Sequence, residues 1–236
     1  MDKPKFIHNL FSRIAGKYNL LNDVMTLSLH RQWKKQTVAI AAKAIKRKDA
    51  KVLDLCTGTG DIAELWIAHP AVKDVIAVDS CAQMLQVGYQ QLEQKFKGPP
   101  PKLQMIEADA LSLPFEDNSF DAVTVGFGLR NVNDLLKACE EIKRVLRPGG
   151  ILVSLDLGHP SIPLVDWLYK NILLKIIPII GMFFAQDKAA YQYLSDSLKT
   201  WPLQKELSQG LYSLGFTRSF TKDIMLGTIA IVAAEK

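Results

Sequence analysis

The sequence has few cysteines and no metal-binding pattern. Its three cysteines, Cys56, Cys81 and Cys139, are odd in number and lack the spacing of metal ligands. A disulfide framework and a zinc site are therefore excluded, no metal is expected, and a reducing compartment is favoured.

Long apolar runs are also lacking. The nearest candidate for a membrane span, Asn171–Ala185, is interrupted by a lysine, a proline and a glycine and falls short of the roughly 20 apolar residues that a span needs. The N-terminus shows no apolar core followed by a small-residue cleavage site, so no secretory signal is expected. We expect a cytoplasmic protein whose contact with a membrane, if there is one, is peripheral and on its inner face.

The 236 residues are 48% hydrophobic and 22% charged, which is the composition of a globular domain. The net charge of +5 and the pI near 9.0 raise the question of an anionic partner. Basic residues are spread along the chain, with short clusters only at Arg31–Lys35 and Lys43–Lys48. Because no appended nucleic-acid module is visible, a solvated basic face is favoured and nucleic acid is not an expected partner.

From residue 50 onward, short apolar runs alternate with helical patterns. The clearest helix is Asp134–Leu146, whose apolar residues recur at helical spacing and which Arg147–Gly150 should stop. Strands that alternate with helices predict right-handed βαβ units around a parallel sheet. Five strands are expected in this part of the chain: Lys51–Leu55, Asp74–Val78, Lys102–Ile106, Ala122–Val125 and Ile151–Leu155.

After the fifth strand the pattern changes. The segment Pro160–Ala185 is apolar but contains three prolines, which predicts an irregular helical insertion too long for an ordinary connection. Helices are expected at Lys188–Lys199 and Leu203–Leu214, followed by an antiparallel strand pair at Phe216–Asp223 and Thr228–Ala233.

One domain accounts for this order of elements, with fold class α/β. We expect residues 1–49 to form an N-terminal helical cap and residues 50–158 a cofactor-binding core. Residues 159–200 would be a helical insertion over an acceptor site, and residues 201–236 a closing helix and strands. The sheet should be mostly parallel with a closing antiparallel strand.

The loop after the first strand carries the first cofactor signal. Residues 52–61 (VLDLCTGTGD) form a buried strand that ends in Gly58-Thr59-Gly60, where glycines let the backbone approach a ligand. A dinucleotide loop would place a third glycine where this chain has Ala63. Asp54 lies inside the strand, and Asp61 at the helix start would repel a pyrophosphate but attract an ammonium or sulfonium group. The plain alternative is a structural turn with Asp61 as a helix cap.

Acidic residues also follow the next two strands, at the edge where open α/β sheets bind ligands. Asp79 ends the second strand, where a carboxylate can accept hydrogen bonds from both ribose hydroxyls. Asp109-Ala110 follows the third strand, where it can accept from an adenine amino group, and Gly126 follows the fourth. Each acid alone is more often a surface cap, but the ordered set favours S-adenosylmethionine (SAM) over NAD as the cofactor.

Three further motifs resemble one particular family. Residues 18–34 (YNLLNDVMTLSLHRQWK) are similar to the Y-D-x-M-N…H-R-x-W-K signature of the ubiquinone/menaquinone biosynthesis C-methyltransferases. Phe127–Val132 (FGLRNV) and Arg144–Gly150 (RVLRPGG) match further motifs of that family, and the similarity runs over nearly the whole chain. The third motif is shared by class I methyltransferases in general, whereas the first two are far more particular.

The resemblance implies a Rossmann-like class I fold and SAM-dependent C-methylation of a prenylated quinol, of the demethylmenaquinone methyltransferase type. Conversion of demethylmenaquinol to menaquinol is the first expectation. Asn19, Leu21 and Asp156 depart from the residues usual in the family, so a 2-phytyl-1,4-naphthoquinol or a ubiquinone precursor stays open as the acceptor. The expected partners are this quinol and a membrane surface, and a homodimer is left open.

Arg130 and Asn131 are the candidate catalytic residues, because they follow the fourth strand and should face the donor methyl in this fold. An arginine stays protonated, so Arg130 would stabilise a quinolate while a bound water takes the proton. The resemblance adds Asp61 as a polar group beside that water. The alternative for Arg130-Asn131 is a helix-capping turn.

The cap contributes Tyr18, His30 and Trp33 as candidate substrate-binding residues. His30 is either a base or a packing residue. Ile172–Phe184 is either ordinary core or an apolar channel for the prenyl tail. The remaining histidines have no partner at a telling spacing and are expected to be incidental: His8, His69 and His159.

Two rival functions remain. A methyltransferase acting on RNA or another small molecule would suit the basic pI but would want a nucleic-acid module. A non-catalytic SAM-binding protein would share the fold, but the presence of Asp61, Asp79, Asp109 and Arg130-Asn131 argues against it.

Overall fold

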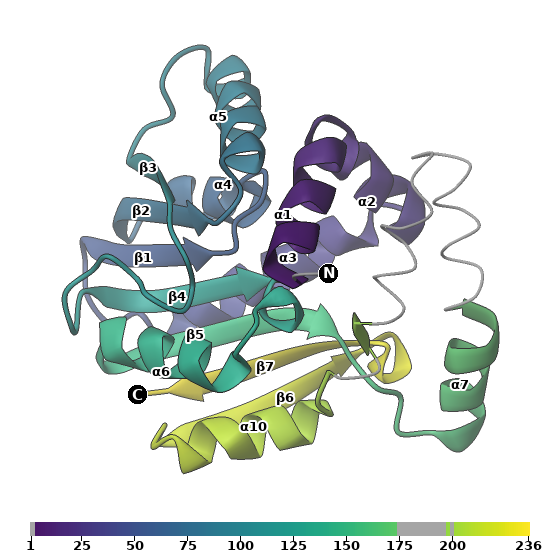
Figure 1. Cartoon of the computed structure of the whole chain (residues 1–236). Coiled ribbons are helices and arrows are strands. Elements are labelled where there is room, and N and C mark those ends of the chain that lie inside the picture. The colour runs from purple at the N-terminus through teal and green to yellow at the C-terminus, as the bar shows by residue number, and fades with distance from the viewer. Residues whose placement is uncertain (1–2, 174–196, 199–200) are drawn as a thin grey trace.

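The apolar runs predicted as strands pair in one sheet in a computed structural model of the chain, which describes residues 3–173, 197–198 and 201–236 (Figure 1). Within these residues the sheet has seven strands in the order β3-β2-β1-β4-β5-β7-β6. Strand β7 runs antiparallel to β5 and β6, while the other neighbours pair in parallel. The expected α/β fold is confirmed. The strand bounds are β1 Ala50–Leu55, β2 Val72–Asp79, β3 Leu103–Glu107, β4 Phe120–Gly126, β5 Leu146–Leu157, β6 Arg218–Ile224 and β7 Ile229–Glu235.

The strand order reverses between β1 and β4. Strand β1 pairs with β2 on one side and with β4 on the other, and both neighbours are parallel to it. The loops that leave β1 and β4 therefore diverge toward opposite faces of the sheet and leave a crevice at their carboxyl ends, the usual ligand position in open α/β sheets.

Helices cover both faces of the sheet. On one face, α3 (Leu29–Ala44) and α4 (Asp61–Ile67) pack against apolar side chains such as Val52 and Val153. On the other, α6 (Leu135–Val145) and α10 (Gln204–Ser213) pack against side chains such as Val123 and Leu152. Because both faces are covered, the central strands are mostly apolar, as parallel strands usually are, with Asp54 and Thr124 as buried polar exceptions.

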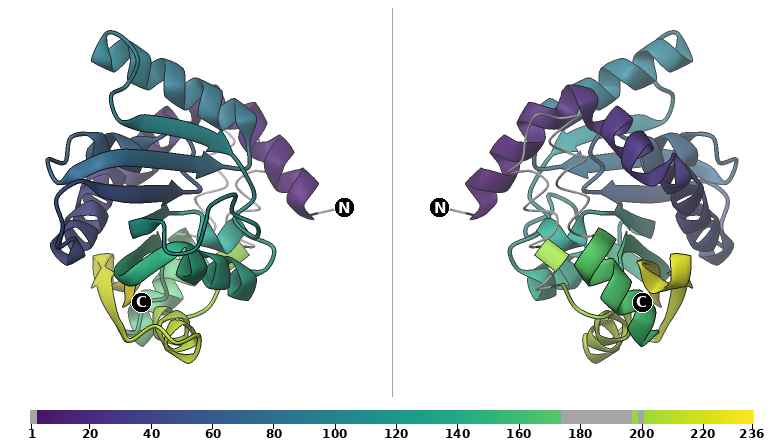
Figure 2. Two further views of the ribbon diagram at one scale, coloured as in Figure 1. Left: turned by 90° about the vertical axis from the view of Figure 1, so that its left-hand side faces the viewer. Right: turned by 90° about the vertical axis from the view of Figure 1, so that its right-hand side faces the viewer.

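The N-terminal helices lie at the carboxyl ends of the parallel strands. Helix α1 (Lys3–Ile14), a short 3-10 turn η1 (Ala15–Lys17) and α2 (Tyr18–Thr26) precede α3. Figure 2 shows α1 lying beside α5 (Ala82–Phe96), with which it is in contact. Residues from the start of the chain are thereby brought next to the loops that follow β1, β2 and β4.

The predicted helix Asp134–Leu146 ends one residue earlier, and the strand after it begins sooner than expected. Helix α6 ends at Val145, with Asp134 as its N-cap accepting a hydrogen bond from the Lys137 amide. Strand β5 already starts at Leu146, and its register against β4 shifts where residues 147–150 bulge. The backbone of Gly149 and Gly150 pairs with Lys236, so the glycines join a strand instead of a free loop.

The insertion after β5 is described in part. Helix α7 spans Pro163–Leu168 and continues as a π-helical turn, η3, over Tyr169–Leu173. The rest of the expected insertion and most of the helix predicted at Lys188–Lys199 lie outside the described residues. The helix and the antiparallel strand pair expected at the end of the chain are confirmed as α10, β6 and β7. Two 3-10 turns follow strands, η2 (Leu129–Asn131) after β4 and η4 (Met225–Gly227) after β6. Among the helices of the described residues, none is long and apolar enough to cross a bilayer.

Candidate active site

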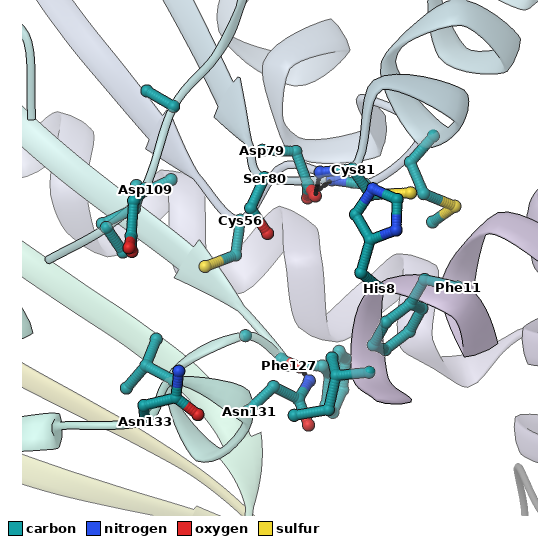
Figure 3. Close-up of a pocket in the computed structure, with 18 of the residues that line it drawn as sticks. His8, Phe11, Cys56, Asp79, Ser80, Cys81, Asp109, Phe127, Asn131 and Asn133 are labelled. Atoms are coloured by element: carbon teal, nitrogen blue, oxygen red, sulfur yellow. Dashed lines mark hydrogen bonds between the residues drawn. The ribbon is translucent and has the colours of Figure 1, made fainter. Parts of the chain in front are cut away.

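A cavity of about 430 Å³ lies at the carboxyl ends of β1, β2 and β4 (Figure 3). The loops after β1, β2, β3 and β4 form its floor and walls, and α1 and α2 complete it. The sheet reversal therefore coincides with an open space of ligand size. Seven residues expected at the site line this cavity: Tyr18, Gly58, Asp79, Asp109, Ala110, Gly126 and Asn131.

The other seven expected residues do not line it. They belong to the loop after β1, to the N-terminal cap or to the ion pairs described below: Asp54, Thr59, Gly60, Asp61, Arg130, His30 and Trp33.

Asp54 organises the glycine loop from inside the sheet. Its side chain is buried and accepts hydrogen bonds from the Thr57 hydroxyl at 2.5 Å, the Thr124 hydroxyl at 3.0 Å and the Ala63 amide at 3.2 Å. Burial raises the pKa of this carboxyl to about 7, against the lowering effect of these hydrogen bonds. These bonds join β1, β4 and α4 and fix the loop in which Gly58 takes a φ of +58°, a backbone conformation that favours glycine.

Asp79 presents a carboxylate at the cavity edge. Its two oxygens accept hydrogen bonds from the backbone amides of Gly58 at 2.8 Å and Cys81 at 2.9 Å. Burial raises the pKa of this carboxyl, while those amide donors act in the opposite direction. Each carboxylate oxygen can accept a second hydrogen bond, and Asp79 lines the cavity. Two hydroxyl groups of a ligand could therefore bind here side by side.

Asp109 and Asn131 line other walls of the cavity. The Asp109 side chain accepts a hydrogen bond from the Leu111 amide at 2.9 Å, which closes a local turn after β3. The side-chain amide of Asn131 donates to the backbone carbonyl of Phe127 at 3.2 Å, which ties the turn η2 back to the end of β4. Figure 3 shows the Asp109 and Asn131 side chains on separate walls of this space.

The loop after β4 is packed too closely for larger residues. A Cβ atom at Gly126 would lie 2.6 Å from the Ile62 side chain, and one at Gly128 would lie 2.3 Å from Cys56 Cβ. Trp33 packs behind this loop, with its ring centroid 6.5 Å from that of Phe127. Trp33 is thus placed to support the cavity wall from behind.

Asp61 is held by a lysine of the cap. The Lys34 ammonium donates to Asp61 Oδ2 at 2.7 Å, and the Lys34 side chain is only 9% exposed. The Thr59 hydroxyl donates in turn to the Asn19 side chain at 2.7 Å. The cap is therefore tied to the start of α4 by two polar contacts. Sequence reasoning missed the pairing of Lys34, whose only signal was its place in the H-R-x-W-K motif.

Arg130 forms an ion pair with Asp156. The Arg130 Nη1 atom donates to Asp156 Oδ1, and the two side chains are only 9% and 4% exposed. Arg130 follows β4 and Asp156 lies on β5. The pair therefore joins the turn after β4 to the neighbouring strand β5, and it was not foreseen from the sequence.

His30 lies in the interior of the cap. Its ring contacts the Thr26 hydroxyl at 3.4 Å, and its Nε2 atom is 3.6 Å from Asp23 Oδ1. Burial lowers the pKa of His30 to about 4, with the Lys34 charge acting in the same direction. The ring is therefore neutral near pH 7 and does not line the cavity, which favours the packing role over that of a base.

Helix α1 contributes cavity residues that the sequence did not indicate. Lys5, His8 and Phe11 line the cavity, and Figure 3 shows His8 projecting from α1 toward Asp79 and Cys81. His8 was expected to be incidental, and its place in the cavity lining was missed because the sequence did not show that α1 folds against α5. No local pattern could have revealed this contact, which depends on the tertiary position of the helix.

A family model and several named relatives match this chain. The model of the ubiE/COQ5 methyltransferase family matches residues 1–236. The chain belongs to this family. A Francisella philomiragia protein named "Ubiquinone/menaquinone biosynthesis C-methyltransferase UbiE" is 38% identical over 98% of this chain and 90% of its own length. A Hahella chejuensis protein of the same name is 37% identical over 98% and 91%.

Solved structures show the same fold at low sequence identity. A SAM-dependent methyltransferase of Aquifex aeolicus superposes with a TM-score of 0.58 at 16% identity, covering 84% of this chain and 88% of its own. One of Thermotoga maritima gives a TM-score of 0.62 at 16% identity, covering 97% and 99%. The Rossmann-like methyltransferase architecture and the family resemblance are both confirmed.

The expected cofactor, SAM, is confirmed by membership of this family. The residues present also fit such a ligand, because the cavity places carboxylates of Asp79 and Asp109 after successive strands. The backbone of Gly58 lines the cavity, and an added Cβ would lie 3.3 Å from the Met84 side chain and 3.7 Å from that of Tyr18. A nucleoside with hydroxyl and amino groups can therefore be accepted on this side.

Proposed function

We propose that this chain methylates a ring carbon of a prenylated quinol, with demethylmenaquinol as the first candidate acceptor and menaquinol as its product. The names of its relatives in Francisella philomiragia and Hahella chejuensis support quinone biosynthesis. The observation that carries the proposal is the cavity at the end of β4, where Asn131 lines the wall and the preceding residue, Arg130, is held by Asp156. A ubiquinone precursor is the second candidate, because the same names cover both quinones.

On the donor side, we propose that Asp79 accepts hydrogen bonds from the ribose hydroxyls and Asp109-Ala110 faces the adenine. SAM supplies a methyl group bound to a positively charged sulfur. Gly58 and Gly126 would let the backbone approach the donor. Asp54, Thr59 and Gly60 would shape the loop without contacting the cavity.

On the acceptor side, we propose that Arg130 stabilises negative charge on the quinol oxygen. Loss of the hydroxyl proton to water sends charge onto the neighbouring ring carbon. This carbon would bond to the methyl group as the bond from methyl to the donor sulfur breaks, and it would then release its own proton to restore the quinol. The guanidinium remains charged at all relevant pH values, and a charge with little water around it acts strongly over several ångströms. Asn131 would orient the acceptor, and Asp61, held by Lys34, would add a polar group at the donor end.

The cap and the insertion are proposed to enclose the acceptor within a single domain. Tyr18 lines the cavity and would contact the ring of the acceptor. His30 and Trp33 would keep the cap in position behind it. In this division residues 1–49 cover one side of the acceptor, and residues 159–200 cover the other.

A peripheral contact with the membrane is also proposed. On α7, the side chains of Leu164 and Trp167 are 67% and 57% exposed. Moving a prenyl tail from lipid into water would cost about 0.8 kcal/mol per CH₂, so a site beside the bilayer is favourable. We expect wild-type protein to sediment with anionic vesicles more than the variant Leu164→Ser/Trp167→Ser does, and equal sedimentation would contradict this contact.

Mass spectrometry of quinones from cells lacking this protein is the decisive experiment. We expect a naphthoquinone lighter by one methyl group to accumulate, and purified protein with SAM to convert its reduced form into the mature quinone. Accumulation of a benzoquinone precursor instead would select the second candidate. Unchanged quinones in the deletion strain would contradict the proposal.

A further inference from the structure

The carboxylate that pairs with Arg130 is itself rigidly placed. Asp156 lies near the end of β5, the strand hydrogen-bonded to β4, and Arg130 lies in the turn η2 that follows β4. Besides the Arg130 contact, Asp156 Oδ1 accepts the backbone amide of Leu157 at 2.8 Å. The Asp156 carboxylate is therefore fixed by the strand that carries it.

Water has little access to this pair. The exposed fractions of the two side chains are 9% and 4%, and Tyr169 beside them is 5% exposed. Burial raises the pKa of the Tyr169 hydroxyl, and the charges of Arg130 and Asp156 act on it in opposite directions. A buried guanidinium without a carboxylate would be strongly unfavourable, so the position of the guanidinium follows that of Asp156.

We propose that Asp156 is a positioning residue for methyl transfer, which holds the Arg130 guanidinium at the end of β4 in the orientation that the acceptor needs. This inference rests on the proposed function, in which Arg130 stabilises charge on the acceptor. The direction in which kcat changes when Asp156 is replaced distinguishes a role of its charge from a role in orienting Arg130. The negative charge of Asp156 by itself opposes formation of a quinolate, so its removal would raise the rate if only charge mattered. Removal of this carboxylate lowers the rate if the orientation of the Arg130 guanidinium matters more than the charge of Asp156.

The test is the variant Asp156→Asn, which keeps the side-chain size and removes the charge. We expect kcat to fall by about 10–100-fold, the scale of a small misplacement of a catalytic group, with KM for SAM unchanged within about twofold. Asp156→Glu restores the carboxylate and should recover part of kcat. An unchanged or raised kcat in folded Asp156→Asn overturns the proposal.

A matched control is available in the same two strands. Asp121 on β4 pairs with Arg147 on β5 at the amino ends of these strands, far from the cavity lining. Asp121→Asn therefore breaks an arginine–carboxylate pair between β4 and β5 and should lower the melting temperature while leaving kcat unchanged. An equal fall of kcat in Asp121→Asn and Asp156→Asn would show a general effect of loosening the sheet and would overturn the proposal.

A double-variant cycle separates this inference from the proposed function. If Asp156 acts through Arg130, then Arg130→Ala/Asp156→Ala is no slower than Arg130→Ala alone, and further slowing overturns the inference. The double variant also removes both buried charges together, so it stays informative if Asp156→Asn folds poorly. Normal turnover in Arg130→Ala contradicts the role of Arg130 and this inference with it, whereas a slow Arg130→Ala with a normal Asp156→Asn contradicts only the role of Asp156. The proposed function itself fails if the wild-type protein does not methylate the reduced quinol.

Discussion

Replacement of Asp79 tests the donor side most directly. Its carboxylate oxygens accept the backbone amides of Gly58 and Cys81, with the Ser80 amide as a lesser donor, and the side chain lines the cavity, where it can accept further hydrogen bonds from a ligand. A hydrogen bond to a charged acceptor contributes about 1.5–3 kcal/mol. Water can enter in place of the carboxylate in Asp79→Ala, so we expect a loss somewhat below that of two bonds, about 2–3 kcal/mol of SAM binding.

The assay is calorimetric titration with SAM, where that loss corresponds to a Kd increased about 30–150-fold. The variant also leaves the amides of Gly58 and Cys81 without their acceptor, at about 1–3 kcal/mol for each bond that stays unmade, so thermal melts must show that the titrated protein is folded. Asp74→Asn is the matched control, because Asp74 is an exposed acid at the other end of the same strand. Affinity within about twofold of wild type in folded Asp79→Ala would refute the assignment of Asp79 to the ligand site.

Three further predictions concern turnover and pH. Arg130→Ala should lower kcat by about 10²–10³-fold with little change in SAM affinity. Arg130→Lys should recover only part of kcat, because lysine lacks the planar fork of donors. A normal kcat of Arg130→Ala in steady-state kinetics would contradict this prediction. The reduced acceptor should be the substrate, since only a hydroquinone has an ionisable hydroxyl, and equal rates on the oxidised quinone without reductant would exclude the mechanism. The pKa of His30 is lowered to about 4 from 6.5, so the unfolded chain binds more protons between these values and stability is lost as pH falls through that window. Urea unfolding should show a loss of about 2 kcal/mol from this residue between pH 7.5 and 5, absent in His30→Gln, and equal pH dependence in both proteins would disprove the shift.

The sheet could be predicted because its signal is local. Central strands such as β1 and β4 are buried on both faces, so their sequences are mostly apolar and are bounded by glycine and polar loops. The placement of Asp79 and Asp109 after successive strands follows directly, since parallel strands end at one edge. Element bounds differed by a few residues, most clearly at β5, where pairing with Lys236 draws Gly149 into the strand.

The partners of the site residues could not be predicted, because they depend on how distant segments pack. Lys34 reaches Asp61 only because α3 lies along α4, and His8 reaches the cavity only because α1 folds against α5. Neither the spacing nor the types of residues within one segment predict which distant segment will contact it. A motif can therefore indicate which side chains belong to the site without indicating which residues hold those side chains in position.

Arg130 shows what this difference means for mechanism. Considered in sequence, Arg130-Asn131 is a pair of polar residues after a strand, and both were expected to face the donor methyl. In the structure only Asn131 lines the cavity, while Arg130 pairs with Asp156 on the next strand. An arginine in water would lose much of its effect on a distant charge through screening, whereas one fixed by a buried carboxylate needs little reorganisation when charge develops nearby. The catalytic contribution proposed for Arg130 thus depends on two neighbouring strands, because Asp156 on β5 holds Arg130 and lies outside the FGLRNV motif.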